Sequence, residues 1–295
     1  MRAIRYRTPG GAVRLAAEES ASRGAGGARF AELDATDVLA ALAGDPRPSG
    51  GTVAADAELR SLEAGFDLLR PLDPPEVWCA GVTYERSRDA RIDEAAVKDV
   101  YTMVYEAERP ELFLKDAACR RTVGPGEPIG LREDASWSVP EPEIGLVLGA
   151  RGAIVGYTIG NDVSSRDIEG ANPLYLPQAK VYAGACAIGP AVVAPRDADE
   201  PFELTMRILD SRGDELYSGT TSTARMRRSF AELAGWLVRD NPVPAGSVLL
   251  TGTGLVPPDD FTLRPGHLVE IRVPGIGTLS NPVVPAGTLL EGAAT

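Results

Sequence analysis

Two carboxylates that are two residues apart stand at the start of an apolar run, "EPEIGLVLG" (141–149). Alternate side chains of a β-strand share one face, so Glu141 and Glu143 are predicted to face the same space. The next strand-like segment, "GYTIGND" (156–162), ends in Asp162, and the small residues beside these acids are predicted to leave room for a ligand. Burying unpaired carboxylates costs several kcal/mol per ion. The pattern therefore indicates a compensating cation.

A hard divalent metal is the cation that this pattern favours. No His or Cys lies close to the three acids in the sequence, and sets of oxygen ligands prefer Mg²⁺, Mn²⁺ or Ca²⁺ to Zn²⁺. One lysine would complete the charge balance of three carboxylates and a divalent ion, and Lys180 is a candidate. Taken alone, however, a Glu-x-Glu pair is more typical of a solvated strand face, so the spacing leaves both interpretations open.

The order of further motifs favours the metal site. "PEPE" (140–143), "GYTIGNDVSSRD" (156–167), a lysine before a Gly-rich strand and "TGTG" (251–254) follow one another along the chain. Over about residues 74–290 this order resembles the fumarylacetoacetate hydrolase superfamily. The resemblance implies a mixed β-sandwich roll and a Mg²⁺ or Mn²⁺ ion that chelates a 2-oxo acid through its carboxylate and keto oxygens. It also implies roles for Glu141, Glu143 and Asp162 as metal ligands, Lys180 as the active-site lysine, and Gly252 with Thr253 as the groups that hold the substrate carboxylate.

One motif departs from the hydrolases of this superfamily. They commonly show G-x-N-Y-x-x-H before the first long helix, with a histidine that pairs with a glutamate to activate water. Here the run is "GVTYERS" (81–87), and Ser87 occupies the place of the histidine. The only histidine of the chain, His267, is predicted to lie in a surface turn between strands. Activation of water by the usual dyad is therefore not expected.

Within the superfamily, "VTYERSR" (82–88) and "EGANPLYLPQAKVY" (169–182) most resemble 2-keto-3-deoxy-sugar-acid dehydratases of the 2-keto-3-deoxy-D-arabinonate type. This resemblance implies dehydration of a 2-keto-3-deoxypentonate, through a metal-stabilised enolate, to a product of the 2-oxoglutarate semialdehyde type. Lys180 is the predicted proton-transfer group, because a nearby divalent cation in a dry site lowers the pKa of a lysine. Glu111, after the first long helix, is its predicted acid/base partner.

Other residues of these motifs are assigned by position. Substrate contacts are expected from Glu169, Gln178, Ser87 and Lys115. Each assignment has an alternative. Glu169 and Gln178 could instead make hydrogen bonds within their loop, and Glu111 could be a surface glutamate. Lys115 could be a solvated lysine, and Lys180 could be only a structural partner of a carboxylate. Arg166 and Asp167 are expected to brace their loop through a salt bridge.

Two other classes of function remain open from the residues alone. One keeps the metal but hydrolyses a C–C bond of an acylpyruvate, or decarboxylates another 2-oxo acid, with Glu111 acting through water. The absence of the dyad histidine at Ser87 argues against a hydrolase. The other class is a metal-dependent protein that binds 2-oxo acids without catalysis, which the combination of Lys180 and Thr253 beside the acids makes less attractive.

The elements that must position these residues change in character near Asp73, where "RPLDPPEVW" (70–78) is rich in proline. Residues 1–72 are predicted to form a small α+β domain with a helix over 30–44. Residues 73–295 are predicted to form the fumarylacetoacetate hydrolase-like catalytic domain. There, many short strands separated by Gly and Pro favour a mainly antiparallel sandwich or barrel. Helices are expected over 85–108 and 223–240.

Bulk composition limits the partners. The chain has 295 residues and a formal net charge of −12, which repels nucleic acid phosphates and anionic lipids. Three widely spaced cysteines favour reduced thiols, and no signal peptide or apolar run of transmembrane length is present. A cytoplasmic enzyme with a small 2-oxo acid substrate is therefore expected. Relatives in the superfamily imply a homodimer or homotetramer.

Overall fold

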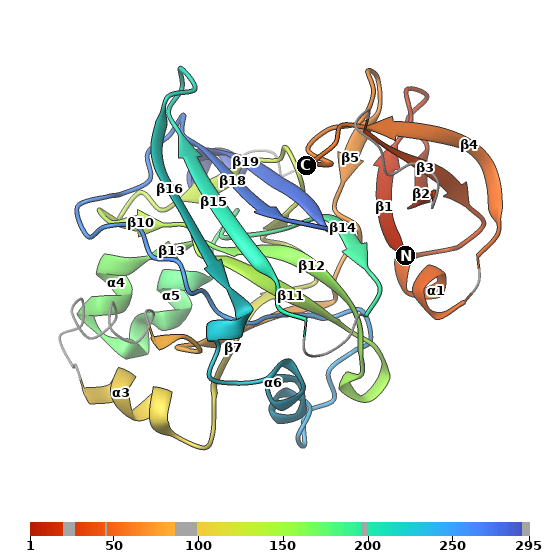
Figure 1. The fold of residues 1–295 in the computed structure, drawn as a ribbon. Helices are drawn as coiled ribbons and strands as arrows, with labels where there is room; N and C mark the ends of the chain where they lie inside the picture. The colour runs from red at the N-terminus through yellow and green to blue at the C-terminus, as the bar shows by residue number, and fades with distance from the viewer. Residues whose placement is uncertain (20–26, 45, 86–98, 196–199, 291–295) are drawn as a thin grey trace.

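A computed structural model describes residues 1–19, 27–44, 46–85, 99–195 and 200–290. Within these residues the strands form one 12-stranded sheet, one five-stranded sheet and one two-stranded pair. Short helices lie around the sheets (Figure 1). The prediction of a mainly β fold with a few helices is confirmed.

The large sheet joins the N-terminal strands to strands from the middle of the chain. Its strand order is β4 (Pro48–Ala55), β3 (Ala28–Leu33), β2 (Val13–Glu18), β1 (Arg2–Arg7), β14 (Cys186–Val193), β12 (Ile154–Asp162), β11 (Pro142–Leu148), β17 (Val248–Leu250), β6 (Glu76–Gly81) and β7 (Glu111–Ala117). Two short strands join this path, β5 (Asp67–Leu69) beside β1 and β8 (Thr122–Val123) beside β14. The N-terminal strands continue the sheet of the predicted catalytic domain (called the catalytic sheet below), because β1 pairs with β14 (right side of Figure 1).

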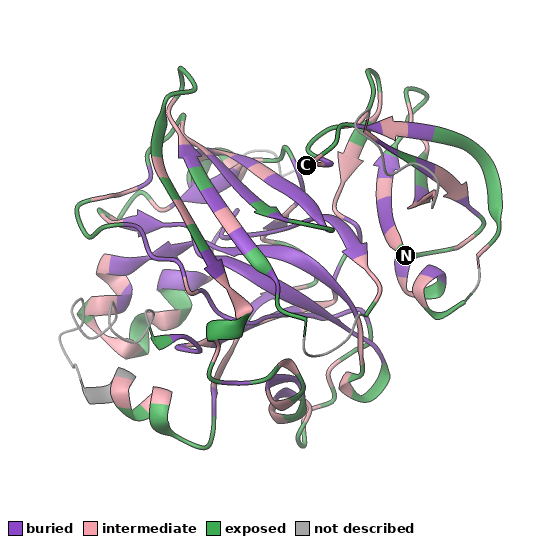
Figure 2. Ribbon diagram, viewed as in Figure 1, coloured by how far each residue is buried: buried purple, intermediate pink, exposed green. Residues whose placement is uncertain are grey.

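The second sheet packs over the middle of the first. Its order is β16 (Glu215–Ser222), β15 (Glu203–Leu209), β18 (Leu268–Val273), β19 (Gly277–Pro285) and β9 (Ile129–Leu131), while β10 (Ser138–Val139) pairs with β13 (Ser164–Ser165). One hydrophobic cluster joins the even-numbered residues of β11 (Ile144, Leu146 and Leu148) to Met206 and Ile271 of this sheet. Val147 of β11 belongs to a second cluster on the other face. β11 is therefore buried on both faces, as Figure 2 shows for the centre of the molecule.

The helices are shorter than predicted. They are α1 (Val38–Ala43), α3 (Asp99–Glu106), α4 (Arg166–Ala171), α5 (Leu176–Lys180) and α6 (Phe230–Leu237), with 3₁₀ turns at Ala150–Gly152, Pro173–Tyr175, Thr223–Arg225 and Ala286–Leu289. The predicted helix over 30–44 is wrong in its first part. Phe30 lies in β3 with its ring fully buried, and that strand pairs with β2 and β4. Cross-strand pairing overrides the local helix propensity there, and the helix begins only after Asp37, whose side chain accepts from the Ala40 N–H at 2.8 Å.

The two other predicted helices are also partly described. In 223–240 the α-helix is limited to Phe230–Leu237, with Ser229 as its N-cap. In 85–108 the structure describes α3, while residues 86–98, including Ser87, lie outside the described residues. Among the described helices, none combines the length and the apolar character needed to cross a bilayer.

Candidate metal centre and active site

The three predicted metal ligands meet at the end of two central strands. β11 and β12 pair antiparallel with Glu143 opposite Gly160, and the Asp162 N–H donates to the Glu141 carbonyl at 3.0 Å. This register brings the three carboxylates together, with one oxygen of each within 4.8 Å of the others. Glu141, Glu143 and Asp162 are at most 3% exposed. The predicted clustering of these acids is therefore present in the structure.

The small residues beside the acids do not leave the predicted space. A Cβ placed at Gly160 would lie 2.3 Å from a methyl group of Leu250. A Cβ at Gly145 would lie 3.0 Å from side-chain atoms of Thr158 and Val248. These glycines let the neighbouring strand β17 pack tightly against β11 and β12, and the open space lies beyond the strand ends.

Lys180 reaches the acidic cluster from the last residue of α5. Its ammonium Nζ donates to Glu141 Oε2 at 2.7 Å, to Asp162 Oδ2 at 3.0 Å and to Ser164 Oγ at 2.5 Å. The side chain is 3% exposed. An ammonium group in this position neutralises part of the carboxylate charge and lies where a bound substrate would meet the cluster.

Two further cations contact the same carboxylates from the protein interior. Arg166, predicted to brace its loop, donates from Nη2 to Glu141 Oε1 at 2.9 Å, while Asp167 accepts from the N–H and hydroxyl of Ser136. Lys115 is fully buried and forms an ion pair with Asp162 Oδ1, without the angles of a hydrogen bond. Burial is the largest influence on the pKa of Lys115 and lowers it, but the Asp162 carboxylate, together with smaller contributions from Cys79 and Tyr182, raises it, and the net shift is upward. The alternative of a solvated lysine at 115 is wrong.

Glu143 is held by the backbone of the Thr-Gly-Thr-Gly segment. The Gly252 N–H donates to Glu143 Oε2 at 2.6 Å. Burial, followed by the charges of Asp162 and Glu141, raises the pKa of Glu143 well above its usual value. The single N–H of Gly252 therefore binds a carboxylate of the acidic cluster, and Thr253, 3% exposed, is the adjoining residue on the cavity wall.

Gly252 is a position where the backbone requires glycine. Its φ is +90°, and a Cβ there would lie 2.0 Å from Thr83 Oγ1. We expect Gly252→Ala to lower the free energy of unfolding by about 2–4 kcal/mol, from overpacking together with the left-handed backbone, and to disturb the bond to Glu143. Gly213→Ala is the matched control, because φ is +87° with no atom within 4 Å of the added Cβ. Urea denaturation of both variants tests this, and equal losses of stability would contradict it.

A small cavity of about 20 Å³ opens onto the acidic cluster. The structure brings Glu111, Glu169, Lys180, Gly252 and Thr253 to its walls together with the three acids, and Phe113 and Leu176, which the sequence reasoning missed, also line it. Glu111 is the first residue of β7 and pairs with Gly81, where a Cβ would lie 2.0 Å from the Glu111 carboxyl oxygen. Glycine at position 81 therefore lets this carboxyl lie across the strand.

Other predicted residues lie elsewhere. Gln178 is exposed on α5 and lines a separate surface hollow with Tyr175 and Asp167, so the structure does not bring it to the acidic cavity. His267 follows a turn, as predicted, and its Nδ1 accepts from the Arg264 N–H at 3.2 Å. Burial and the nearby Arg264 lower the pKa of His267.

Charge balance at the site fits a divalent cation. In the described part of the chain, five carboxylates line the cavity (Glu111, Glu141, Glu143, Asp162 and Glu169), and three cations contact them (Lys115, Arg166 and Lys180). A divalent ion would offset further negative charge among the three buried acids, since burial of carboxylates together is costly without a compensating cation. Asp162 Oδ1 is buried and accepts no hydrogen bond, and it forms an ion pair with the Lys115 ammonium group. An all-oxygen ligand set is suited to Mg²⁺, Mn²⁺ or Ca²⁺.

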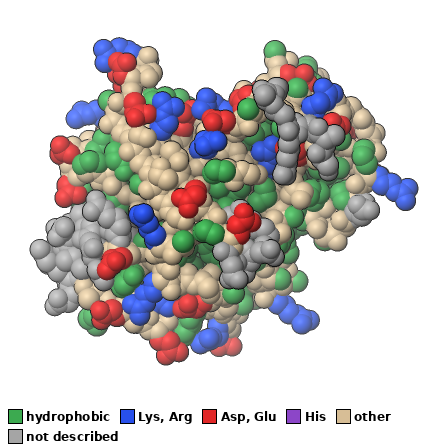
Figure 3. Space-filling view, viewed as in Figure 1, with side chains coloured by type: hydrophobic (Ala, Val, Ile, Leu, Met, Phe, Trp, Pro, Cys, Tyr) green, Lys and Arg blue, Asp and Glu red, His purple; other side chains and the backbone are tan. Residues whose placement is uncertain are grey.

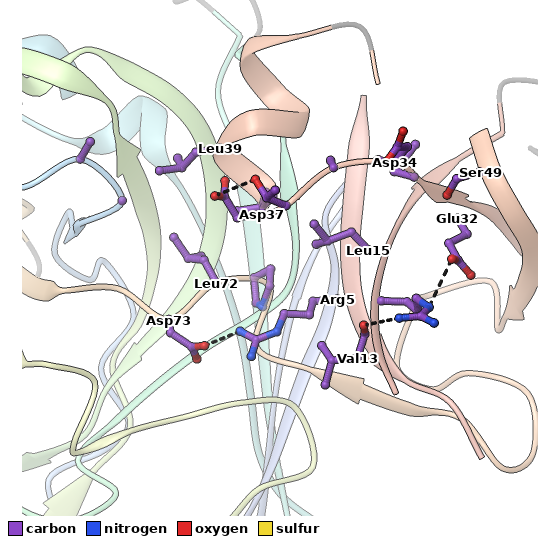
Figure 4. Close-up of a pocket in the computed structure, with 18 of the residues that line it drawn as sticks. Arg5, Val13, Leu15, Glu32, Asp34, Asp37, Leu39, Ser49, Leu72 and Asp73 are labelled. Atoms are coloured by element: carbon purple, nitrogen blue, oxygen red, sulfur yellow. Dashed lines mark hydrogen bonds and ion pairs between the residues drawn. The ribbon is translucent and has the colours of Figure 1, made fainter. Parts of the chain in front are cut away.

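A larger cavity, of about 720 Å³, lies between the N-terminal strands and the catalytic sheet, and it contains none of these acids (Figure 4). Its arginines are already paired with carboxylates. Arg5 donates to Asp73 at 2.6 Å, and Arg14 lies 3.3 Å from Glu32. By size alone this cavity would be the candidate site. Its ion pairs are half exposed, however, and exposed ion pairs need no further cation. The buried acids of the smaller cavity do need one. The smaller cavity is therefore the candidate site.

The arrangement defines a β-sandwich protein with a buried, all-carboxylate site for a divalent cation. Residues 76–284 match the domain described as "Fumarylacetoacetate (FAA) hydrolase C-terminal". The chain belongs to the fumarylacetoacetate hydrolase family.

Relatives within the family are similar over most of their length. The chain is 55% identical over 214 residues to the "Probable 2-keto-3-deoxyxylonate dehydratase" of Haloferax volcanii, covering 72% of this chain and 73% of that protein. It is 46% identical over 222 residues to the "2-dehydro-3-deoxy-D-arabinonate dehydratase" of Saccharolobus solfataricus, covering 73% and 74%. A solved structure, "2-keto-3-deoxy-D-arabinonate dehydratase complexed with magnesium and 2,5-dioxopentanoate", matches with a TM-score of 0.83 and 37% identity over 97% of this chain and 99% of that chain.

Proposed function

We propose that this protein is a metal-dependent hydro-lyase that dehydrates a 2-keto-3-deoxypentonate to the semialdehyde of 2-oxoglutarate. The observation that carries the proposal is the buried cluster of three carboxylates, with Lys180 in contact with two of them. The similarity to two dehydratases of 2-keto-3-deoxypentonates supports the substrate class. Magnesium in the similar solved structure supports the choice of metal.

The residues that would hold a magnesium ion are Glu141, Glu143 and Asp162. When bound, such an ion would hold the carboxylate and keto oxygens of the substrate and acidify its C3 proton. Arg166 and the Gly252 N–H keep two of these carboxylates oriented, since each donates a hydrogen bond to one of them.

Lys180 and Glu111 are proposed to move the protons. Lys180 Nζ lies at the cavity wall and, in the neutral amine form that a nearby divalent cation would favour, would accept the C3 proton. Glu111, on the wall contributed by β7, would protonate the C4 hydroxyl as it leaves as water. Loss of water leaves a C3–C4 double bond conjugated with the C2 ketone. Transfer of a proton from C5 to C3 then gives a C4–C5 enol, which tautomerises to the C5 aldehyde of the semialdehyde. Glu169, 5% exposed at the cavity, would bind a sugar hydroxyl, and Thr253 would bind the substrate carboxylate.

Removal of the metal tests this proposal. We expect exhaustive chelation with EDTA to abolish turnover of 2-keto-3-deoxypentonates, and excess Mg²⁺ to restore it, because the buried acids need a divalent ion to bind and activate the substrate. Products are identified by mass spectrometry with 2-keto-3-deoxypentonates and, in parallel, with acylpyruvates. A semialdehyde supports the proposal. Pyruvate with a second acid would indicate a C–C hydrolase, and loss of CO₂ a decarboxylase. Turnover that persists after chelation would contradict the metal site.

Further properties are proposed from the composition of the chain and from its family. We propose a cytoplasmic enzyme that assembles as a homodimer or homotetramer and does not bind nucleic acid. The net charge of −12 and the interspersed acidic and basic side chains on the face in Figure 3 are consistent with a partner that is a small molecule. We also propose that residues 1–72 act as a small packing domain and 73–295 as the catalytic domain.

A further inference from the structure

Lys115 is a buried cation that contacts the acidic cluster but not the cavity. Its side chain is 0% exposed, and Nζ donates to the Val163 carbonyl at 3.0 Å and pairs with Asp162 Oδ1. Glu111 and Phe113 of the same strand line the cavity, whereas Lys115 is absent from its walls. The ammonium group therefore lies behind Asp162, on the side away from the substrate.

A β-bulge directs Lys115 into this position. In the pairing of β6 with β7, Trp78 lies opposite Leu114 and Val77 opposite Asp116, so Lys115 is an extra residue without a partner. Leu114 is exposed, while Lys115 and Asp116 are both buried, which breaks the alternation of a regular strand.

The bulge is anchored on its C-terminal side. Asp116 accepts hydrogen bonds from the Arg121 N–H at 2.8 Å and from the Thr122 N–H and hydroxyl at 2.9 and 2.8 Å. These bonds hold the strand in the shape that turns Lys115 inward. Bulges beside active sites commonly re-aim a side chain in this way.

The composition of the chain makes a lysine at this site unusual. Only three of its 30 Lys and Arg residues are lysines, and two of these three, Lys115 and Lys180, contact Asp162. An ammonium group is compact, whereas a guanidinium is planar and larger. The enclosed space behind Asp162 fits a compact cation, and burial of a lysine is costly unless its charge is used.

We propose that Lys115 is a positioning residue that offsets the charge of Asp162 from behind, so that the metal-loaded site attracts an anionic 2-oxo acid. The inference rests on the proposed function, because it assumes that a divalent ion binds the three acids. Lys115 and Lys180 both pair with Asp162, so loss of Lys115 would leave more negative charge at the three acids even with a divalent ion bound. The loaded site would then repel a carboxylate substrate while holding its metal more tightly.

Binding measurements without turnover test this inference. Lys115→Gln keeps a hydrogen-bond donor but removes the charge, and Lys115→Met removes both. For each variant, calorimetry gives the Kd of Mn²⁺ alone and then the Kd of pyruvate, the simplest 2-oxo acid, at saturating Mn²⁺. We expect Mn²⁺ to bind at least about tenfold more tightly and pyruvate at least about tenfold more weakly in both variants. Arg60→Gln, which removes a half-exposed charge paired with Glu270, is the control and should change neither Kd.

The outcomes separate the inference from its alternatives. An unchanged Kd for Mn²⁺ together with weaker pyruvate binding would show that Lys115 contacts the substrate. No change in the Kd of either Mn²⁺ or pyruvate would show that Lys115 has no role at the site. Either result overturns the inference. Weaker Mn²⁺ binding overturns it too, because it would mean that only ligand orientation matters. If Lys115→Met does not fold, as thermal denaturation would reveal, Lys115→Gln decides the matter. Failure of the wild-type protein to dehydrate 2-keto-3-deoxypentonates would refute the proposed reaction without changing these binding constants.

Discussion

Replacing Glu143 with glutamine is expected to lower kcat/KM by at least about 1,000-fold, because a bound divalent ion contributes several kcal/mol to the stabilisation of the transition state. Glutamine has the shape of glutamate, and its amide oxygen can still accept from the Gly252 N–H, so the fold should survive. The lost charge should also weaken Mg²⁺ binding. Kinetics with a 2-keto-3-deoxypentonate and calorimetric titration with Mg²⁺ measure the two effects.

The control for this variant is a buried glutamate outside the site. Glu270 is 6% exposed and pairs with Arg60 at 3.0 Å on the five-stranded sheet. Glu270→Gln should therefore affect stability but leave kcat/KM within about threefold of wild type, as expected for a site that shares no partner with the cavity. If Glu143→Gln retained kcat/KM within tenfold of wild type, Glu143 would not be a ligand of a catalytic metal.

Lys180→Ala is expected to abolish useful turnover while metal binding survives. A positioned proton-transfer group contributes about 100- to 10,000-fold to the rate, and kcat should fall by this factor. The three carboxylates remain in place in this variant and lose a competing ammonium group, so Mg²⁺ should bind at least as tightly as before. Single-turnover kinetics at saturating Mg²⁺ measure the loss of kcat.

A milder change at the same contact is the matched control. Ser164→Ala removes the hydroxyl that lies 2.5 Å from Lys180 Nζ but leaves the ammonium group and its two carboxylate partners. Its effect on kcat should stay below about tenfold, the size expected for one hydrogen bond. Full activity of Lys180→Ala would remove Lys180 from the mechanism.

The clustering of the acids was predictable because it depends on short-range rules. The Glu-x-Glu spacing places two carboxylates on one strand face, and the turn between β11 and β12 is short enough for the next strand to pair directly. The lysine motif likewise led to Lys180. The order of motifs, rather than any single spacing, decided between a metal site and a solvated strand.

The environment of Lys115 was not predictable by the same rules. The burial of Lys115 depends on a bulge between β6 and β7 and on its contact with Asp162 of β12. Asp162 lies 47 positions after Lys115 in the chain. Gln178 shows the converse case, because a place in the right motif on α5 did not bring its side chain to the cavity. Successive side chains of a helix point in different directions around its axis, so only some residues of that motif face the cavity.

Residue types, local spacing and the order of the motifs together identified the mainly β fold, the three acids and the lysine beside them. Strand alternation and the cost of burying charge act over a few residues, and the motif order added the resemblance to a known family. Tertiary structure decided which cations contact those acids from the interior, that the Gly252 N–H holds Glu143, and that β1 extends the catalytic sheet through β14. These contacts join segments far apart in the chain. Their formation depends on strand order and packing, which no local pattern specifies.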